Sequence, residues 1–250
     1  MPRLALLSAS GLRSAFGSYG KSMQVGRAAA DGLLAARMAA AGATVGPGVE
    51  AGPAGIVEVL GADPARILED SGPTTPAIRQ NWLKAYPCCL QTHACIDAAR
   101  DLDISAAELK AGQGTVVVHP VSRQAAAYDD VTTGLEARLS IPYTTAFTLL
   151  HGPPGWRTFD EVEDPVRAVA RRTAVLMDVS LDPNACLLEW SVGERLLRAR
   201  VETPRGSPAR PLDAYDRETK IRDLGTADLL GSLDDPDRPA GGLAYTLGVR

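Results

Sequence analysis

The chain has 250 residues, of which 45% are hydrophobic, and a formal net charge of −4; this suits a folded globular protein without the basic field that nucleic-acid binding needs. It contains no apolar run of membrane-spanning length, and its N-terminal apolar stretch is too short for a signal peptide. Four cysteines in a chain of this size favour reduced thiols over a disulfide framework, so we expect a cytoplasmic protein that binds neither nucleic acid nor membrane.

The first part of the chain is predicted to be helical. After a loop that ends near residue 19, Gly20 and Lys21 indicate a turn directly before a helix over residues 26–41, where apolar side chains recur at helical spacing. Gly42 is a natural C-terminal stop for this helix. A lysine that loses hydration near a helix N-terminus has a lowered pKa, which suits proton transfer or anion binding. A surface lysine is the commoner arrangement at this spacing.

A domain boundary is predicted after two short helical pieces. These pieces are expected over residues 56–60 and 64–70, and Asp63 caps the second. The segment over residues 71–76, with the sequence SGPTTP, is rich in residues that favour turns. After this segment the pattern changes from helical to mixed helix and strand.

The second part of the chain combines helices and strands. The expected elements, in chain order, are a helix over 91–101, a short helix opened by a capping box at 105–108, a strand over 115–118, a mostly helical stretch over 131–150 entered near Ser140 or Pro142, an amphipathic helix from 164 to about 177, two antiparallel strands over 185–190 and 196–202, and a charged helix over 213–224. The chain is therefore predicted to be α+β.

Four blocks of the sequence, in this order, carry a family resemblance. They lie at residues 8–32, at 84–99 with the motif KAYPCC followed by TH and IDAA, at 139–146 with the sequence LSIPYTTA, and at 201–220 with VETPRGSP followed by PL and a lysine. Together they resemble the MmgE/PrpD family, which includes 2-methylcitrate dehydratase, cis-aconitate decarboxylase and iminodisuccinate epimerase. Four ordered blocks are far more specific than any one of them.

The resemblance implies a particular layout. Members of the family have a large all-helical domain and a smaller α+β lid domain, with the active site between them. In that layout residues 1–75 form the end of the helical domain, residues 76–205 form the lid, and residues 206–250 return towards the helices. The resemblance covers only the C-terminal part of the family's length.

The resemblance also implies a chemistry. The chain is expected to be a lyase component, a dehydratase or decarboxylase, that acts on a small di- or tricarboxylate such as 2-methylcitrate or cis-aconitate. Removal of water needs a base for a C–H proton and an acid for the departing hydroxyl, and it requires neither a cofactor nor a metal. The alternatives are an isomerase or epimerase of the same family, or a non-catalytic subunit or scaffold.

Three residues are expected to carry the catalysis. Lys21 matches the family's lysine and would hold a carboxylate or relay a proton. Tyr143 offers a phenol that donates a proton or a hydrogen bond, and its alternative role is that of a core tyrosine. His93 matches the family's Thr-His pair and would act as acid or base, or it is a capping or core histidine.

Three further residues are expected to bind substrate. Arg13 and Lys84 are candidates for binding the carboxylates of the substrate. Each of them is alternatively a charged surface residue. Gln24 stands where the family commonly has a histidine. A glutamine donates and accepts hydrogen bonds, but it cannot exchange a proton near pH 7.

The resemblance implies a partner besides the small carboxylate substrate. The family's N-terminal half supplies most of the helical domain, and without it the helices near residues 1–70 expose an apolar face, which favours association. We expect either a second polypeptide that carries the N-terminal helical half or a homo-oligomer.

Overall fold

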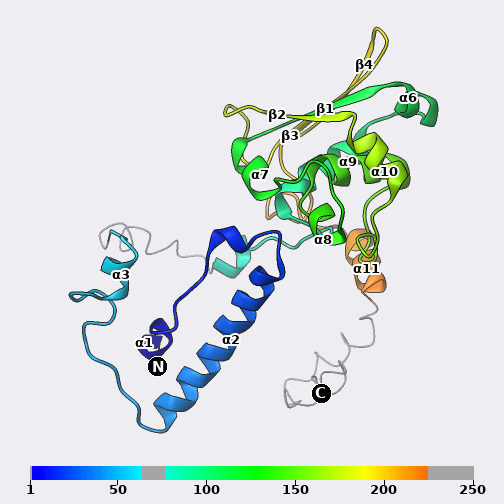
Figure 1. Ribbon diagram of the computed structural model, residues 1–250. Coiled ribbons are helices and arrows are strands. Elements are labelled where there is room, and N and C mark those ends of the chain that lie inside the picture. The colour runs from blue at the N-terminus through cyan, green and yellow to red at the C-terminus, as the bar shows by residue number, and fades with distance from the viewer. Residues whose placement is uncertain (1, 64–76, 225–250) are drawn as a thin grey trace. The chain divides into compact units, whose positions relative to one another are not determined.

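The computed structural model describes residues 2–63 and 77–224 (Figure 1). The chain divides into two compact units, residues 1–79 (unit 1) and residues 80–250 (unit 2). The predicted helical piece over 64–70 and the predicted boundary at 71–76 lie outside the described residues. The division into domains ending at residues 75 and 205 therefore stays a prediction.

The helices of both units were compared with the length and hydropathy of membrane-spanning helices. Across residues 2–63 and 77–224, no helix combines the length and the apolar character needed to cross a bilayer.

Unit 1 is built around one long helix. Its elements are α1 (Pro2–Leu6), the 3-10 turn η1 (Arg13–Ala15), α2 (Tyr19–Ala40) and α3 (Ile56–Val59). The α2 helix begins at Tyr19, earlier than predicted, because the Ser18 hydroxyl caps it by accepting a hydrogen bond from Gly20 N. Its predicted end is confirmed, since Gly42 follows in the left-handed region with φ of +88°. Ala35 is its one buried residue.

Unit 2 is an α+β domain, which confirms the predicted fold class. Beginning with η2 (Ala77–Gln80) at the boundary, its elements are η3 (Leu90–Thr92), α5 (His93–Asp101), α6 (Ala106–Ala111), β1 (Gln113–Val118), α7 (Pro120–Ala125), α8 (Gly134–Ala137), α9 (Ile141–His151), α10 (Asp164–Ala170), β2 (Thr173–Met177), β3 (Cys186–Val192), β4 (Arg195–Val201) and α11 (Ala214–Asp223).

The core of unit 2 lies between a mixed sheet and its helices. The strand order is β2-β1-β3-β4, with β1 and β2 parallel and the other pairs antiparallel. Helix α5 packs on β3 and β4, and α9 contacts α5, α10 and β2 (Figure 1). Alternate strand residues point into this layer, among them Val116, Leu188 and Trp190, which are fully buried. The sheet therefore fixes the position of α5, which leads to the site.

The predicted helix from residue 164 to about 177 is wrong in its second half. The helix α10 ends at Ala170, and Thr173–Met177 form β2, in which Val175 pairs with Val116 of β1. Pairing with β1 satisfies the backbone groups of this segment, and its β-branched residues fit a strand. Tertiary pairing thus overrides the helical periodicity.

Several local predictions are confirmed by their hydrogen bonds. Ser105 and Glu108 form the capping box of α6, with Ser105 N donating to Glu108 Oε2 at 2.9 Å. Ser140 caps α9 by accepting a hydrogen bond from Tyr143 N at 3.1 Å. The preceding residues 131–139 are not one continuous helix, because they contain only the short α8. Gly193, with φ of +57°, lies in the turn between β3 and β4.

Candidate functional site

The residues predicted to form the site are divided between the two units. Arg13, Lys21 and Gln24 lie in unit 1, whereas Lys84, His93 and Tyr143 lie in unit 2. The convergence of Lys21 and Tyr143 on one pocket stays a prediction.

Lys21 and Gln24 both lie on α2. Lys21 is in the first turn of the helix and not in a turn before it, because capping by Ser18 starts the helix at Tyr19. Its side chain is exposed, and Nζ lies 5.0 Å from the centre of the Phe16 ring. Gln24 accepts a hydrogen bond from Leu12 N at 3.3 Å and donates one to Leu12 O at 3.5 Å. Its amide therefore holds the preceding segment against α2, next to the exposed Arg13.

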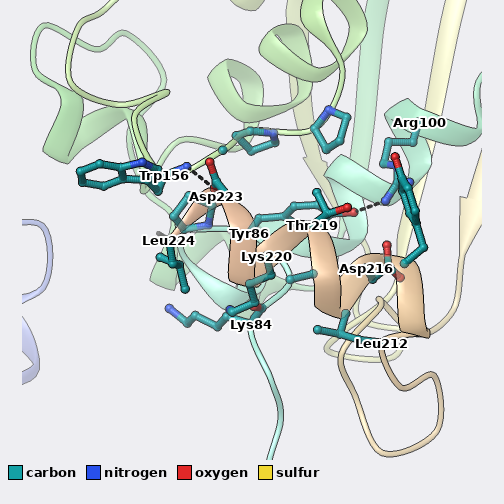
Figure 2. A pocket seen from close by; sticks show the side chains of 16 residues that line it. Lys84, Tyr86, Arg100, Trp156, Leu212, Asp216, Thr219, Lys220, Asp223 and Leu224 are labelled. Atoms are coloured by element: carbon teal, nitrogen blue, oxygen red, sulfur yellow. Dashed lines mark hydrogen bonds between the residues drawn. The ribbon is translucent and has the colours of Figure 1, made fainter. Parts of the chain in front are cut away.

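A pocket of about 560 Å³ opens in unit 2, within the range of ~300–1,000 Å³ that small-molecule sites occupy. It lies between the segment over residues 84–87, the loop over residues 153–156 and helix α11 (Figure 2). Apolar side chains, including Trp156, Leu212 and Leu224, form part of its wall. Its charged lining residues are Lys84, Arg100, Asp216, Lys220 and Asp223.

Lys84 and Lys220 lie next to each other on the wall of the pocket (Figure 2). Lys84 Nζ donates a hydrogen bond to the carbonyl of Cys88 at 2.8 Å, and Lys220 Nζ donates one to the carbonyl of Lys84. Partial burial lowers the pKa of Lys220, and the charge of Lys84 lowers it further. Two like charges are thus held close together where water is partly excluded.

The carboxylates of the pocket are bonded to groups other than these lysines. Asp223 Oδ2 accepts a hydrogen bond from Trp156 N at 2.8 Å, and Asp216 Oδ2 accepts one from Arg205 Nη1 at 3.3 Å. Within the described part of the chain, neither Lys84 nor Lys220 forms an ion pair with a carboxylate. The two ammonium groups are therefore not in direct contact with a carboxylate among the described residues.

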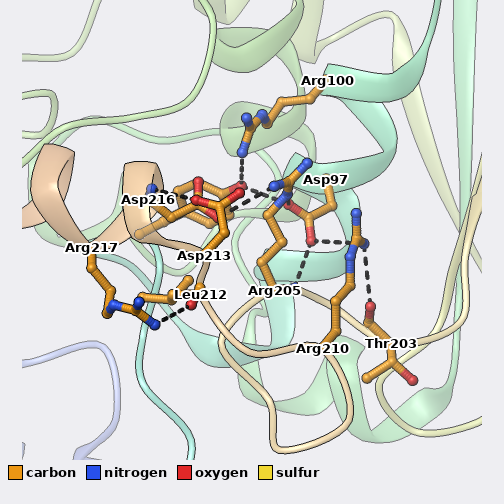
Figure 3. A network of polar contacts seen from close by, with 10 residues as sticks. Asp97, Arg100, Thr203, Arg205, Arg210, Leu212, Asp213, Asp216 and Arg217 are labelled. Atoms are coloured by element: carbon orange, nitrogen blue, oxygen red, sulfur yellow. Dashed lines mark hydrogen bonds and ion pairs between the residues drawn. The ribbon is translucent and has the colours of Figure 1, made fainter.

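Two residues that line the pocket belong to a polar network centred on Asp97 (Figure 3). At its centre the side chain of Asp97 on α5, which has no exposed surface, accepts hydrogen bonds from Tyr86 Oη at 2.6 Å and from Arg205 N at 2.8 Å. Arg210 Nη1 lies 3.4 Å from Asp97 Oδ2, and Arg100 Nη1 donates to Tyr86 Oη at 2.9 Å. Because Tyr86 and Arg100 also line the pocket, the network fixes one wall of it.

His93 lies behind Tyr86, with the ring centres 5.1 Å apart. It is fully buried, and neither ring nitrogen makes a hydrogen bond of normal geometry within the described residues, although the nearby Tyr86 backbone favours protonation slightly. Burial, together with the charges of Lys84 and Lys220, lowers the pKa of His93 to about 3. The ring is therefore neutral at pH 7.

The burial of neutral His93 predicts a loss of stability in acid. Between pH 6.5 and about pH 3 the unfolded chain binds a proton at this residue and the folded chain does not. The free energy of unfolding should then fall by about 1.4 kcal/mol for each pH unit, with no contribution above pH 6.5. Urea denaturation of wild type and His93→Asn at several pH values measures the slope, which the substitution should reduce. An unchanged slope, equal to that of a His151→Asn control, would contradict the assignment.

Tyr143 lies on α9 in the core, away from the residues that line the pocket. Its side chain is fully buried, and its hydroxyl accepts a hydrogen bond from Glu163 N at 3.0 Å. Burial raises the pKa of Tyr143. The phenol is therefore protonated at neutral pH.

Unit 2 is thus an α+β domain with a partly apolar pocket whose wall carries Lys84 and Lys220. The family model of the MmgE/PrpD C-terminal domain matches residues 86–231, which is more than half of the chain, and the chain belongs to the MmgE/PrpD family. No curated protein matches it significantly.

Sequence reasoning assigned no role to two residues that organise this site. Lys220 belongs to a charged helix, where nothing in the sequence distinguishes a pocket lysine from a surface lysine. Asp97 does carry a signal, because it is a lone carboxylate among apolar residues of one helical turn. Such a carboxylate, once buried, requires partners, but the sequence does not identify Arg205 and Arg210 as those partners.

Proposed function

We propose that the chain is a lyase component that removes water or carbon dioxide from a small di- or tricarboxylate by acid–base chemistry without a cofactor. The observation that carries the proposal is the ammonium group of Lys84, held on the wall of a pocket in a domain of the MmgE/PrpD family. A pocket with two ammonium groups that form no ion pair within the described residues, and with partly apolar walls, suits a carboxylate on a short carbon skeleton.

The states of the buried groups suggest their roles. Tyr143 is protonated at neutral pH, so it would donate a hydrogen bond or a proton to the departing group. His93 is neutral, so it would accept a proton. A bound carboxylate would offset the charges of Lys84 and Lys220 and so raise the pKa of His93, whereas the larger effect of burial would remain.

Unit 1 carries a candidate residue of its own, Lys21. Lys21 is exposed on α2, and we propose that it binds or protonates substrate once a further surface encloses it. Apolar side chains of the same helix are exposed, among them Leu33 at 57% and Leu34 at 56%. They support association with a second polypeptide carrying a helical half, or with another copy of the chain.

Turnover of carboxylates by the purified chain, alone and with any chain that co-purifies with it, tests the proposal. We expect 2-methylcitrate or cis-aconitate to lose water or carbon dioxide. Lys84→Gln should lower kcat/KM by about 10–100-fold, since a hydrogen bond to a charged group contributes about 1.5–3 kcal/mol. Tyr143→Phe should lower kcat by about 10²–10⁴-fold if the phenol donates the proton.

The control for charge is Lys110→Gln, which removes an exposed ammonium from α6, away from this pocket. It should leave kcat/KM unchanged. No turnover across a panel of di- and tricarboxylates, or an unchanged kcat/KM in Lys84→Gln, would overturn the lyase proposal. Deuterium exchange into substrate without loss of water or carbon dioxide would instead indicate an isomerase or epimerase.

A further inference from the structure

The pairing of Lys220 with Lys84 is the feature of the pocket that the proposed function does not explain. Helix α11 begins at Ala214, where Asp213 caps it by accepting a hydrogen bond from Asp216 N at 2.7 Å. From this helix Lys220 reaches the chain before α5, where its Nζ donates a hydrogen bond to the carbonyl of Lys84. Lys220 is partly buried there, whereas its neighbour Arg222 is 72% exposed and pairs with Glu218.

The donors of the two ammonium groups are only partly used. An ammonium group has three N–H donors. Lys84 donates one hydrogen bond to the carbonyl of Cys88, and Lys220 donates one to the carbonyl of Lys84. Counting only bonds to residues 2–63 and 77–224, each ammonium group therefore keeps two donors for a ligand, while its own carbonyl bond holds it in place.

No direct ion pair neutralises either ammonium group within the described residues. Of the nearby carboxylates, Asp216 is bonded to Arg205, and Asp223 is bonded to the uncharged Trp156 N and keeps its own negative charge. Holding two ammonium groups together in a partly dehydrated wall is unfavourable until an anion arrives. A single carboxylate offsets one of the two charges, whereas a ligand with two carboxylates offsets both.

We infer that Lys220 is a substrate-specificity residue, which together with Lys84 binds anions carrying two or more carboxylates in preference to monocarboxylates. The inference rests on the proposed function for the class of ligand. It adds Lys220 as the residue that distinguishes dicarboxylates from monocarboxylates. The apolar residues Leu212 and Leu224 line the same pocket and would contact the carbon skeleton.

Binding of matched acids to the full chain tests the inference. Succinate and butyrate both have four carbons but carry two and one carboxylates at pH 7. Isothermal titration calorimetry at one ionic strength should show tighter binding of succinate to wild type. Lys220→Gln should raise the Kd of succinate at least tenfold and change that of butyrate less than threefold, and Lys220→Arg should restore part of the preference.

Controls separate a charge effect from a structural one. Arg222→Gln removes one positive charge from the same helix and should leave both Kd values unchanged. If Lys220 only fastens α11 to the carbonyl of Lys84, Lys220→Gln should weaken succinate and butyrate alike, and this result would overturn the inference. Urea denaturation of each variant shows that it is folded.

The outcomes also separate the inference from the proposed function. Succinate binding that depends on Lys84 but not on Lys220 overturns the inference and leaves the lyase proposal intact. Succinate binding that depends on Lys220, without turnover of any carboxylate, supports the inference and overturns the lyase proposal. A wild-type chain that binds neither acid overturns both.

Discussion

Asp97→Ala is expected to lower the free energy of unfolding by about 3–5 kcal/mol, the cost of removing one partner from a buried ion pair. The carboxylate accepts hydrogen bonds from Tyr86 Oη and Arg205 N, and Arg210 pairs with it at 3.4 Å. Alanine would leave the buried Tyr86 hydroxyl and the Arg205 amide without this acceptor, and Arg210 without its ion-pair partner. Urea denaturation at pH 7 measures the loss.

Two companion variants sharpen this result. Asp97→Asn keeps the shape and one acceptor oxygen, so it should be less destabilising than alanine. Asp101→Ala changes an exposed carboxylate at the end of the same helix and should shift stability by less than about 0.5 kcal/mol. Equal effects of the two alanine variants would show that the network contributes little.

Gly206→Ala is expected to destabilise unit 2 by about 2–5 kcal/mol and to weaken anion binding. Gly206 has φ of +88°, and a Cβ there would lie 1.9 Å from the carbonyl oxygen of Leu83. Leu83 N also donates a hydrogen bond to Gly206 O at 2.8 Å. A side chain would add backbone strain at Gly206. It would also push the segment that contains Leu83, just before Lys84, away from Gly206. Denaturation and the Kd of succinate measure the two effects.

Gly152→Ala provides the matched control. Gly152 follows α9 with φ of +86° and ψ of −173°, a backbone conformation that glycine alone adopts readily, but a Cβ there would meet no atom within 4 Å. This variant should cost about 1–3 kcal/mol of backbone strain and leave the Kd of succinate unchanged. If both variants behave alike, the close approach of Leu83 does not position Lys84.

Local signals explain why most elements were predictable from the sequence. The capping boxes and caps at Ser105 and Ser140, and the turn at Gly193, act over a few residues, so they are readable without knowledge of the fold. The segment 173–177 was not readable, because its apolar residues fit helix and strand alike and only β1 decides between them.

The site was less predictable, because it depends on contacts between distant segments. Lys84 and Tyr143 were selected by a family resemblance, and the structure shows Lys84 at a pocket and Tyr143 in the core. Their roles stay predictions. The pairing of Lys84 with Lys220 joins residues 136 positions apart, and no periodicity or short motif encodes a contact of that separation.

The position of the Asp97 partners in the chain has a consequence for biosynthesis. Arg205 and Arg210 follow Asp97 by 108 and 113 residues. A nascent chain that has left the ribosome only as far as β4 would contain the sheet and its helices, but an acidic group without its cationic partners. Because these contacts join residues so far apart in the sequence, the fold cannot be completed until the segment after β4 has been synthesised. Protection against proteases should therefore arise late in translation, in one step.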